Sequence, residues 1–177
     1  MTIEGLTPVQ QQLSAGNRSI VSLCKEVAKQ VLAQPHLITE VVDSLGSEIS
    51  GVPSRAARVV ELVCLESPDL VRPFKREILD SYAWIDEWQV RAHLSKVIPF
   101  LELNRKDVDL AYQIFDRYLS DRSSVVRTFA MQGMFDLLDR APERTDSVRE
   151  LIEELTGSGT PAMLARGRML LVALEKM

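Results

Sequence analysis

The feature that most constrains this chain is an arginine that recurs at a nearly constant interval. Arg55, Arg91, Arg127 and Arg166 each stand at the start of an apolar run with helical spacing, and successive arginines lie 36, 36 and 39 residues apart. Self-similarity at a fixed period of about 20–50 residues is typical of repeat proteins, in which each repeat packs on its neighbours. The period therefore predicts an array of similar helical units.

The apolar spacing, the prolines and the capping residues predict helices throughout and no strand. The expected helices cover residues 18–34, 37–46, 54–66, 67–82, 86–103, 107–120, 125–140, 145–155 and 161–177. Pro73 and Pro99 fall inside two of them and should bend them, because proline has no backbone N–H to donate. We expect residues 1–17 to form a loosely held arm, in which Val9 and Leu13 have the spacing of a short helix.

The composition fits a folded domain and argues against several classes of function. Hydrophobic residues make up 46% of the 177 residues, which is enough for a core. The net charge of −4 does not favour a phosphate-binding surface. Cys24 and Cys64 lie inside expected helices and should be buried thiols. No signal segment and no apolar run of about 18 residues is present, so we expect a soluble cytoplasmic protein without membrane contact.

After the first helix, the expected helices form four pairs, and the recurring arginine stands near the start of the second helix of each pair. Aligning these four second helices on their arginines divides each helix into two faces. Positions −1, +3, +7 and +10 from the arginine fall on one face and should form the core. In the two middle repeats these core residues are Val90, Leu94, Ile98, Leu101, Val126, Ala130, Met134 and Leu137. The match weakens in the first and last repeats, as expected where a repeat array is capped.

This pattern resembles the HEAT repeat family over roughly residues 36–177. The resemblance rests on Val90-Arg91 and Val126-Arg127 at the start of second helices, on Pro73 within a first helix, and on Asp86 and Asp121 in the preceding turns. It implies a right-handed α–α superhelix of about four helical hairpins, preceded by an extra N-terminal helix, in one domain over residues 18–177. The implied repeats are 36–66, 67–103, 106–140 and 144–177.

The resemblance also implies a structural role for the aligned arginines. In HEAT proteins the turn aspartate and the arginine hydrogen-bond across turns or between repeats, which assigns Asp86 to Arg91 and Asp121 to Arg127. Arg55 and Arg166 occupy the same position without a matching aspartate. A guanidinium suits this structural role because it can donate to several carbonyls and carboxylates at once.

The face opposite the expected core is more apolar than a solvated face should be. In a HEAT-like stack it lines the concave side, so we hypothesise an apolar groove, centred on Phe100 and Phe135, that receives a helix or an extended peptide. Alternatively, neighbouring repeats bury this face, or the N-terminal arm or a second copy in a homodimer covers it. The candidate partner-binding residues on this face are Val60, Lys96, Phe100, Gln132, Phe135 and Leu171.

Tyr82, Trp84 and Trp88 form the one aromatic cluster of the sequence, at an expected hairpin turn. Aromatic side chains in a turn can anchor a protein partner. They can also fill the space between two helical hairpins. Both interpretations of Trp84 and Trp88 stay open at this point.

No catalytic, metal or cofactor site is evident, so we expect a protein that is not an enzyme and holds no cofactor. His36 and His93 have no other ligand at a metal-binding spacing. Phosphate-binding loops and nucleophile elbows are absent from the sequence. Glu153 and Glu154 are adjacent on a helix and should be solvated. Asp109 and Asp116 share a helix face, but nothing else marks them as catalytic.

Three functional hypotheses follow. The preferred one is a scaffold or adaptor module that binds a protein or peptide. The first alternative is nucleic-acid binding, because one family of DNA glycosylases has a HEAT-like fold; the net charge argues against it. The second alternative is a lyase-like or chaperone-like helper of a cofactor-bearing protein, as some bacterial HEAT-like proteins are.

Overall fold

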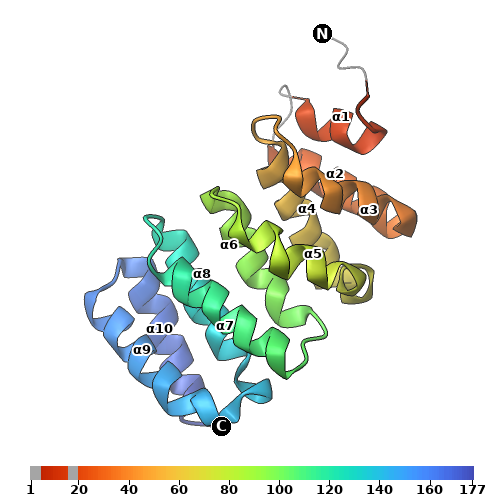
Figure 1. Cartoon of the computed structure of the whole chain (residues 1–177). Coiled ribbons are helices and arrows are strands. Elements are labelled where there is room, and N and C mark those ends of the chain that lie inside the picture. Colours follow the sequence, from red (N-terminus) through yellow and green to blue (C-terminus); the bar gives the residue numbers. More distant parts are fainter. Residues whose placement is uncertain (1–4, 16–19) are drawn as a thin grey trace. The chain divides into compact units, whose positions relative to one another are not determined.

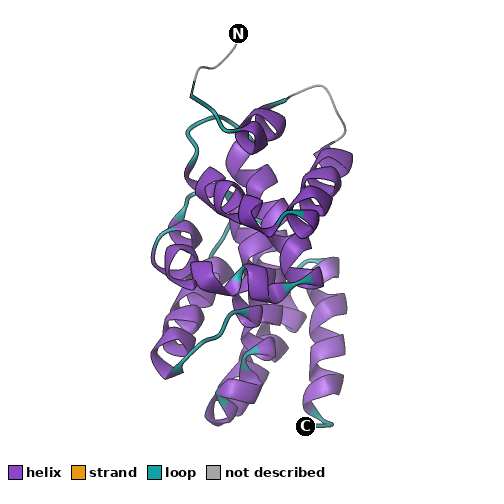
Figure 2. Ribbon diagram, turned by 90° about the vertical axis from the view of Figure 1, so that its right-hand side faces the viewer, coloured by secondary structure: helices purple, strands orange, loops and turns teal. Residues whose placement is uncertain are grey.

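The computed structural model describes residues 5–15 and 20–177 of the chain. Across these ranges every regular element is a helix and no strand is present (Figure 2). The prediction of an all-α fold is therefore confirmed. The chain divides into two compact units, Met1–Glu102 and Leu103–Met177. The division falls between the second and third expected repeats, whereas the sequence suggested one domain over residues 18–177.

The α-helices of both units are labelled in Figure 1. Unit 1 (Met1–Glu102) contains α1 (Pro8–Ser14), α2 (Ile20–Ala33), α3 (Ile38–Asp43), α4 (Val52–Glu66), α5 (Lys75–Asp80) and α6 (Trp88–Val97). Unit 2 (Leu103–Met177) contains α7 (Arg105–Leu119), α8 (Ser124–Asp136), α9 (Thr145–Ser158) and α10 (Pro161–Leu174). Short 3₁₀ turns join or extend several of these helices.

The N-terminal stretch is more ordered than the sequence suggested. Thr7 and Gln10 form a capping box that starts α1, because each side chain accepts a hydrogen bond from the other residue's backbone N–H. Val9 and Leu13 are buried. The described part of the expected loose arm is thus a helix that packs on α2, α3 and α4. Residues 1–4, 16 and 17 of that arm lie outside the described residues.

Helix α4 is the centre of unit 1, where it packs against α1, α2, α3 and α6. A helix with neighbours on so many sides needs apolar residues around most of its circumference. Ala57, Val59 and Val60 are accordingly all 0% exposed, although Ala57 and Val59 lie on nearly opposite sides of the helix. The apolar face of α4 that we assigned to a groove is therefore buried by other helices of the same unit.

The expected helix over residues 67–82 is wrong. Pro73 provides no backbone N–H for the carbonyl of Asp69, and in an α-helix its ring would clash with that carbonyl. The chain instead forms 3₁₀ turns at Pro68–Leu70, Arg72–Phe74 and Tyr82–Trp84, with the single α-helix α5 between them.

Near Pro99 the α-helix ends, whereas we expected the helix over residues 86–103 only to bend there. Helix α6 ends at Val97, and Ile98–Phe100 continue as a 3₁₀ turn. The tighter turn keeps Ile98 and Leu101 fully buried. The core positions of this repeat are therefore retained although the α-helix stops.

Unit 2 consists of two helical hairpins, α7–α8 and α9–α10, and the second helices α8 and α10 also pack on each other. Glycines allow two of these contacts to be close. A Cβ atom on Gly133 would lie 2.5 Å from Cζ of Phe115 in α7, and a Cβ atom on Gly167 would collide with Thr156 in α9. A larger residue at either position would push the paired helices apart.

The expected core register is correct in the middle and wrong at the ends. All eight core positions of the two middle repeats are buried. In contrast, Leu65 in α4 is 56% exposed and Met169 in α10 is 65% exposed. Helix α10 has extensive contacts with two helices, α8 and α9. Its remaining side faces solvent. The handedness and the superhelical stacking implied by the resemblance stay predictions.

Candidate functional site

The residues predicted to line an apolar groove have different surroundings. Val60 is 0% exposed in α4, so it offers no surface to a partner, and its assignment to the groove is wrong. Phe100 is 42% exposed, whereas Phe135 and Leu171 are half-buried. Phe100 belongs to unit 1 and Phe135 to unit 2, so a groove that joins them stays a prediction.

The two polar members of that set connect helices. Lys96 of α6 donates from Nζ to Oε1 of Glu61 in α4, at 3.1 Å. Gln132 of α8 accepts a hydrogen bond from Nη1 of Arg166 in α10, at 2.8 Å, and donates to Asp136 at 2.7 Å. Both residues therefore join neighbouring second helices within their own unit.

The two tryptophans are partly exposed at the turn between α5 and α6. Trp84 is 37% exposed and donates from its indole nitrogen to the carbonyl of Leu79, at 2.8 Å. Trp88 is 44% exposed and begins α6. The hydrogen bond fixes the ring of Trp84 on its own hairpin, while the exposed surface of both rings leaves the role of a partner anchor open.

The aligned arginines make different contacts. Arg91 donates from Nη1 to Asp86 at 2.9 Å, and Arg55 donates from Nη1 to the carbonyl of Leu13, at the end of α1, at 2.5 Å. Arg166 reaches α8 instead of its own turn. These contacts fasten the second helices to a turn, to α1 and to a neighbouring second helix.

Asp121, which the resemblance pairs with Arg127, makes a hydrogen bond within its own turn. Asp121 accepts a hydrogen bond from the backbone N–H of Ser123, at 2.7 Å. An aspartate that accepts from the backbone two residues later stabilises a tight turn. Asp121 therefore orders the turn that leads into α8.

An apolar pocket of about 300 Å³ lies between α8 and α10 in unit 2. Most of its lining side chains are apolar, and two of them, Val125 and Met169, are 42% and 65% exposed. Arg166 is its one charged lining residue. The residues that line the apolar pocket are Val125, Thr128, Phe129, Ala162, Ala165, Arg166 and Met169.

A basic pocket of about 260 Å³ occupies a related place in unit 1, among α2, α4 and α6. Arg55 lines it, and Arg55 holds the same repeat position in α4 as Arg166 holds in α10. The residues that line the basic pocket are Ile20, Val21, Ser54, Arg55, Arg58, Gln89 and His93. In each unit, a pocket thus lies beside the aligned arginine, in the first half of a second helix.

Glu61 is the centre of the polar contacts between α4 and α6, directly beside the basic pocket. Its side chain is 5% exposed, and it accepts hydrogen bonds from Arg58 at 2.8 Å and from Lys96 at 3.1 Å. Nδ1 of His93 lies 2.5 Å from the other carboxylate oxygen. Because an ionised carboxylate only accepts, this ring nitrogen carries the proton in the pair.

These partners keep Glu61 ionised. Burial raises the pKa of Glu61, but the hydrogen bonds from His93 and Arg58 and the charge of Lys96 outweigh it and lower the pKa from 4.5 to about 2. The result is a fixed negative charge that two cationic side chains share.

A third pocket, of about 270 Å³, has a polar lining between α7 and the start of α9. Arg144 donates to Asp109 at 2.8 Å and lies 4.5 Å above the ring of Tyr112, whose hydroxyl donates to the carbonyl of Met134 at 3.0 Å. Burial raises the pKa of Tyr112 to about 12, and burial also raises the pKa of Asp116 despite the charge of Arg144. Arg144 is thus held on both sides, which gives it a structural role.

Sequence reasoning missed the Glu61 and Arg144 clusters. Both depend on contacts about one repeat apart, between residues 61 and 96 and between residues 109 and 144. The available signal was a charged residue, Glu61, inside the apolar run Val59-Val60-Glu61-Leu62-Val63. A charge at such a place is expected to be buried with partners.

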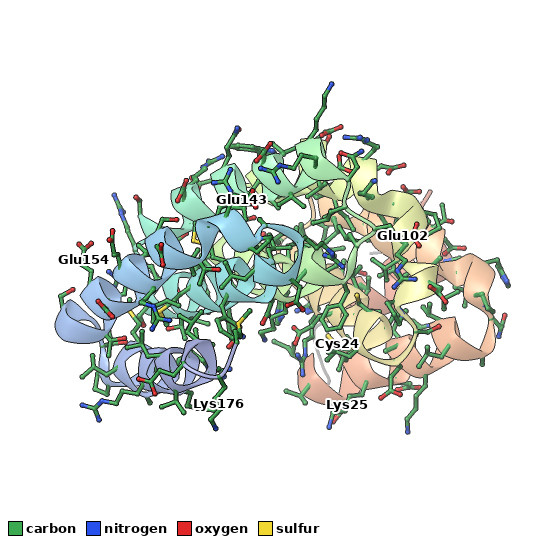
Figure 3. The ribbon with its side chains drawn as sticks, turned by 90° about the horizontal axis from the view of Figure 1, so that it is seen from below. Cys24, Lys25, Glu102, Glu143, Glu154 and Lys176 are labelled. Carbon is green, nitrogen blue, oxygen red and sulfur yellow. The ribbon has the colours of Figure 1, made fainter. Side chains whose placement is uncertain are left out.

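The remaining sequence expectations concern chemistry and location. Within residues 5–15 and 20–177, no group of three His, Cys, Asp or Glu side chains could hold a metal ion. Cys24 and Cys64 are buried free thiols. Glu153 is exposed, as is Glu154, which projects from α9 (Figure 3). No helix in the described part of the chain has the length and apolar character needed to cross a bilayer.

Comparisons with protein families, with curated proteins and with solved structures find no match for this chain. The resemblance to HEAT repeats therefore rests on the residues of this chain alone.

Proposed function

We propose that this chain is a non-enzymatic, HEAT-like α-solenoid module that binds protein segments along its second helices. The observation that carries the proposal is the apolar pocket between α8 and α10. Exposed apolar side chains that converge on a concave site are typical of binding surfaces. The packing of α8 on α10 supports the repeat arrangement, because neighbouring second helices contact each other in an α-solenoid.

The size and lining of the apolar pocket favour a peptide side chain as the ligand. Pockets for small molecules and cofactors run from about 300 to 1,000 Å³ and carry several placed polar groups. This pocket, at about 300 Å³, stands at the lower limit and offers Arg166 as its one charged group. An apolar side chain of a bound segment fits such a lining, and nucleic acid, which needs several cations, does not.

The lining side chains suit this role in different ways. Met169 is flexible and polarisable, so it can adapt to the shape of an inserted side chain. Arg166 is oriented by its hydrogen bond to Gln132 and keeps further N–H donors, which can bind a backbone carbonyl of the segment. We therefore expect an extended segment whose apolar residue enters the pocket beside Arg166.

The test is a selection of random peptides displayed on phage against the intact protein, followed by fluorescence polarisation with the enriched peptides. Met169→Lys places a charge in the pocket. Val172→Lys is the matched control, because Val172 is 50% exposed on the same helix but does not line the pocket. Burial of one apolar side chain contributes about 1.5–3 kcal/mol, so Met169→Lys should weaken binding at least about ten-fold.

The control variant should bind within about two-fold of the unchanged protein. Failure to enrich any peptide, or an equal loss in both variants, would contradict the proposal. In the second case the peptide contacts the outer side of α10 and not the pocket.

A further inference from the structure

The basic pocket of unit 1 has a composition that points to a specific ligand. Its lining combines two arginines, Arg55 and Arg58, with the exposed apolar side chains of Ile20 and Val21. No carboxylate is among the lining residues that the structure describes. In a chain with a net charge of −4, this is a local concentration of positive charge.

The charges around the pocket do not cancel. Two arginines, Arg55 and Arg58, line the pocket, whereas Glu61 lies beside it and accepts from both Arg58 and Lys96. Because Glu61 is shared between these two cations, it offsets only part of the positive charge of the lining. The pocket therefore keeps a positive charge, which favours an anionic ligand.

Arg58 has the capacity to bind that ligand. Glu61 engages Nη1 of Arg58, and a guanidinium carries five N–H donors in total. The side chain of Arg58 is 32% exposed and lines the pocket. The carboxylate of Glu61 thus orients Arg58, and the remaining donors suit a second carboxylate, which arginine binds in a planar, bidentate manner.

The apolar part of the lining restricts the ligand further. Ile20 is 56% exposed and Val21 is 58% exposed, side by side at the start of α2. A free inorganic anion would leave this apolar surface in water. A segment that presents an acidic group next to an apolar side chain would cover both parts of the pocket.

The nearby carboxylate weakens, but does not cancel, the attraction for an anion. Glu61 is ionised, and it repels any anion that approaches Arg58, while Arg55 and Arg58 attract it. A doubly charged phosphate scales both effects alike, so a phosphorylated peptide is compared directly with a carboxylate peptide in the test below.

We propose that the basic pocket binds an acidic peptide segment, with the carboxylate of an Asp or Glu side chain on Arg58 and Arg55 and a neighbouring apolar side chain on Ile20 and Val21. The inference rests on the proposed function, because it assigns a second pocket to peptide binding. Both tests use the intact protein, but this one follows residues of unit 1 and the test of the apolar pocket follows variants of unit 2, so each can fail without the other.

The experiment is a titration of the intact protein, followed by methyl NMR of Ile20 and the other isoleucines. The probes are three blocked tripeptides: Leu-Glu-Leu, Leu-Gln-Leu and Leu-phosphoserine-Leu. We expect Leu-Glu-Leu to shift the Ile20 methyl signals saturably, and Leu-Gln-Leu to bind at least about five-fold more weakly, because it lacks the charge.

The variants change the charge of the pocket at an exposed position, so that folding is not at risk. Val21→Glu should weaken the binding of Leu-Glu-Leu at least about five-fold, and Val21→Lys should strengthen it about two-fold. Leu65→Glu is the matched control, because Leu65 is 56% exposed in the same unit and does not line the pocket. This variant should leave the affinity unchanged.

Three outcomes would overturn the inference. The first is equal binding of Leu-Glu-Leu and Leu-Gln-Leu, or no shift with either. The second is tighter binding of Leu-phosphoserine-Leu, which would make the pocket a phosphate site. The third is an equal effect of Val21→Glu and Leu65→Glu, which would place the peptide elsewhere on unit 1.

Discussion

Replacing Glu61 by Gln should destabilise unit 1 in a manner that depends on pH. The pKa of Glu61 lies at about 2 in the folded chain against an ordinary value of 4.5. The difference of about 2.5 pH units corresponds to about 3 kcal/mol of preferential stabilisation of the ionised form. The Glu61→Gln substitution removes this contribution and leaves the cations of Arg58 and Lys96 without their shared counterion.

The sign of the pH dependence follows from the lowered pKa. The stabilisation by Glu61 is complete above pH 4.5 and disappears as the pH falls towards 2, because the folded chain then binds the proton that the unfolded chain already holds. The gap in unfolding free energy between the unchanged chain and the variant should be about 3 kcal/mol at pH 7. By the same relation it should fall to about 1.4 kcal/mol at pH 3.

The assay is urea denaturation at pH 7 and pH 3, followed by tryptophan fluorescence. Trp84 and Trp88 are the only tryptophans and both lie in unit 1, so the signal reports the unit that contains Glu61. Glu66→Gln is the control, since Glu66 is exposed on the same helix and should change stability by less than about 0.5 kcal/mol. A gap below 1 kcal/mol at pH 7, or one that is equal at both pH values, would refute the reasoning.

Two further predictions concern packing and thiol reactivity. Gly133→Ala should lower the unfolding free energy by about 1–3 kcal/mol in urea denaturation followed by circular dichroism, because its Cβ would meet the buried ring of Phe115. Gly157→Ala, with no atom within 4 Å of its Cβ, should raise that free energy by up to about 1 kcal/mol; a loss in both variants would contradict the packing argument. Burial raises the pKa of Cys24 and Cys64, the latter to about 11, so both thiols should react with Ellman's reagent at pH 8 far more slowly in the native chain than in urea. Rapid native reaction of either thiol would show that its helix opens readily.

The sequence predicted most helices correctly because their signals are local. Amphipathic spacing and capping residues act within one or two turns, so the positions of α7 and α8 and the buried register of the middle repeats could be derived from them. The predicted helix boundaries were wrong where apolar spacing and a proline have opposite effects. Around Pro73 the apolar spacing favours an α-helix, but the missing N–H of this proline and its ring oppose it, and the chain forms 3₁₀ turns.

The contacts between repeats could not be predicted to the same extent. The pairs of Glu61 with Lys96 and of Asp109 with Arg144 join residues 35 positions apart. A shift of one residue in the register of α4 or α6 turns a side chain by about 100° around its helix and would separate Glu61 from Lys96. The sequence gives the period but not the rotation of each helix, so it cannot choose which polar residues meet.

The same geometry explains why the assignment of Val60 to a partner-binding face was wrong. A second helix in a repeat array is covered by its own first helix and by the second helices on either side, so apolar residues on two faces can be pure packing. In this chain α4 packs against α2 on one hand and α6 on the other, and Val60 in α4 is 0% exposed. An apolar face therefore indicates a binding surface only where a neighbour is missing or set apart. Val125 and Met169, which are exposed beside a pocket, meet that condition, and the buried residues of α4 do not.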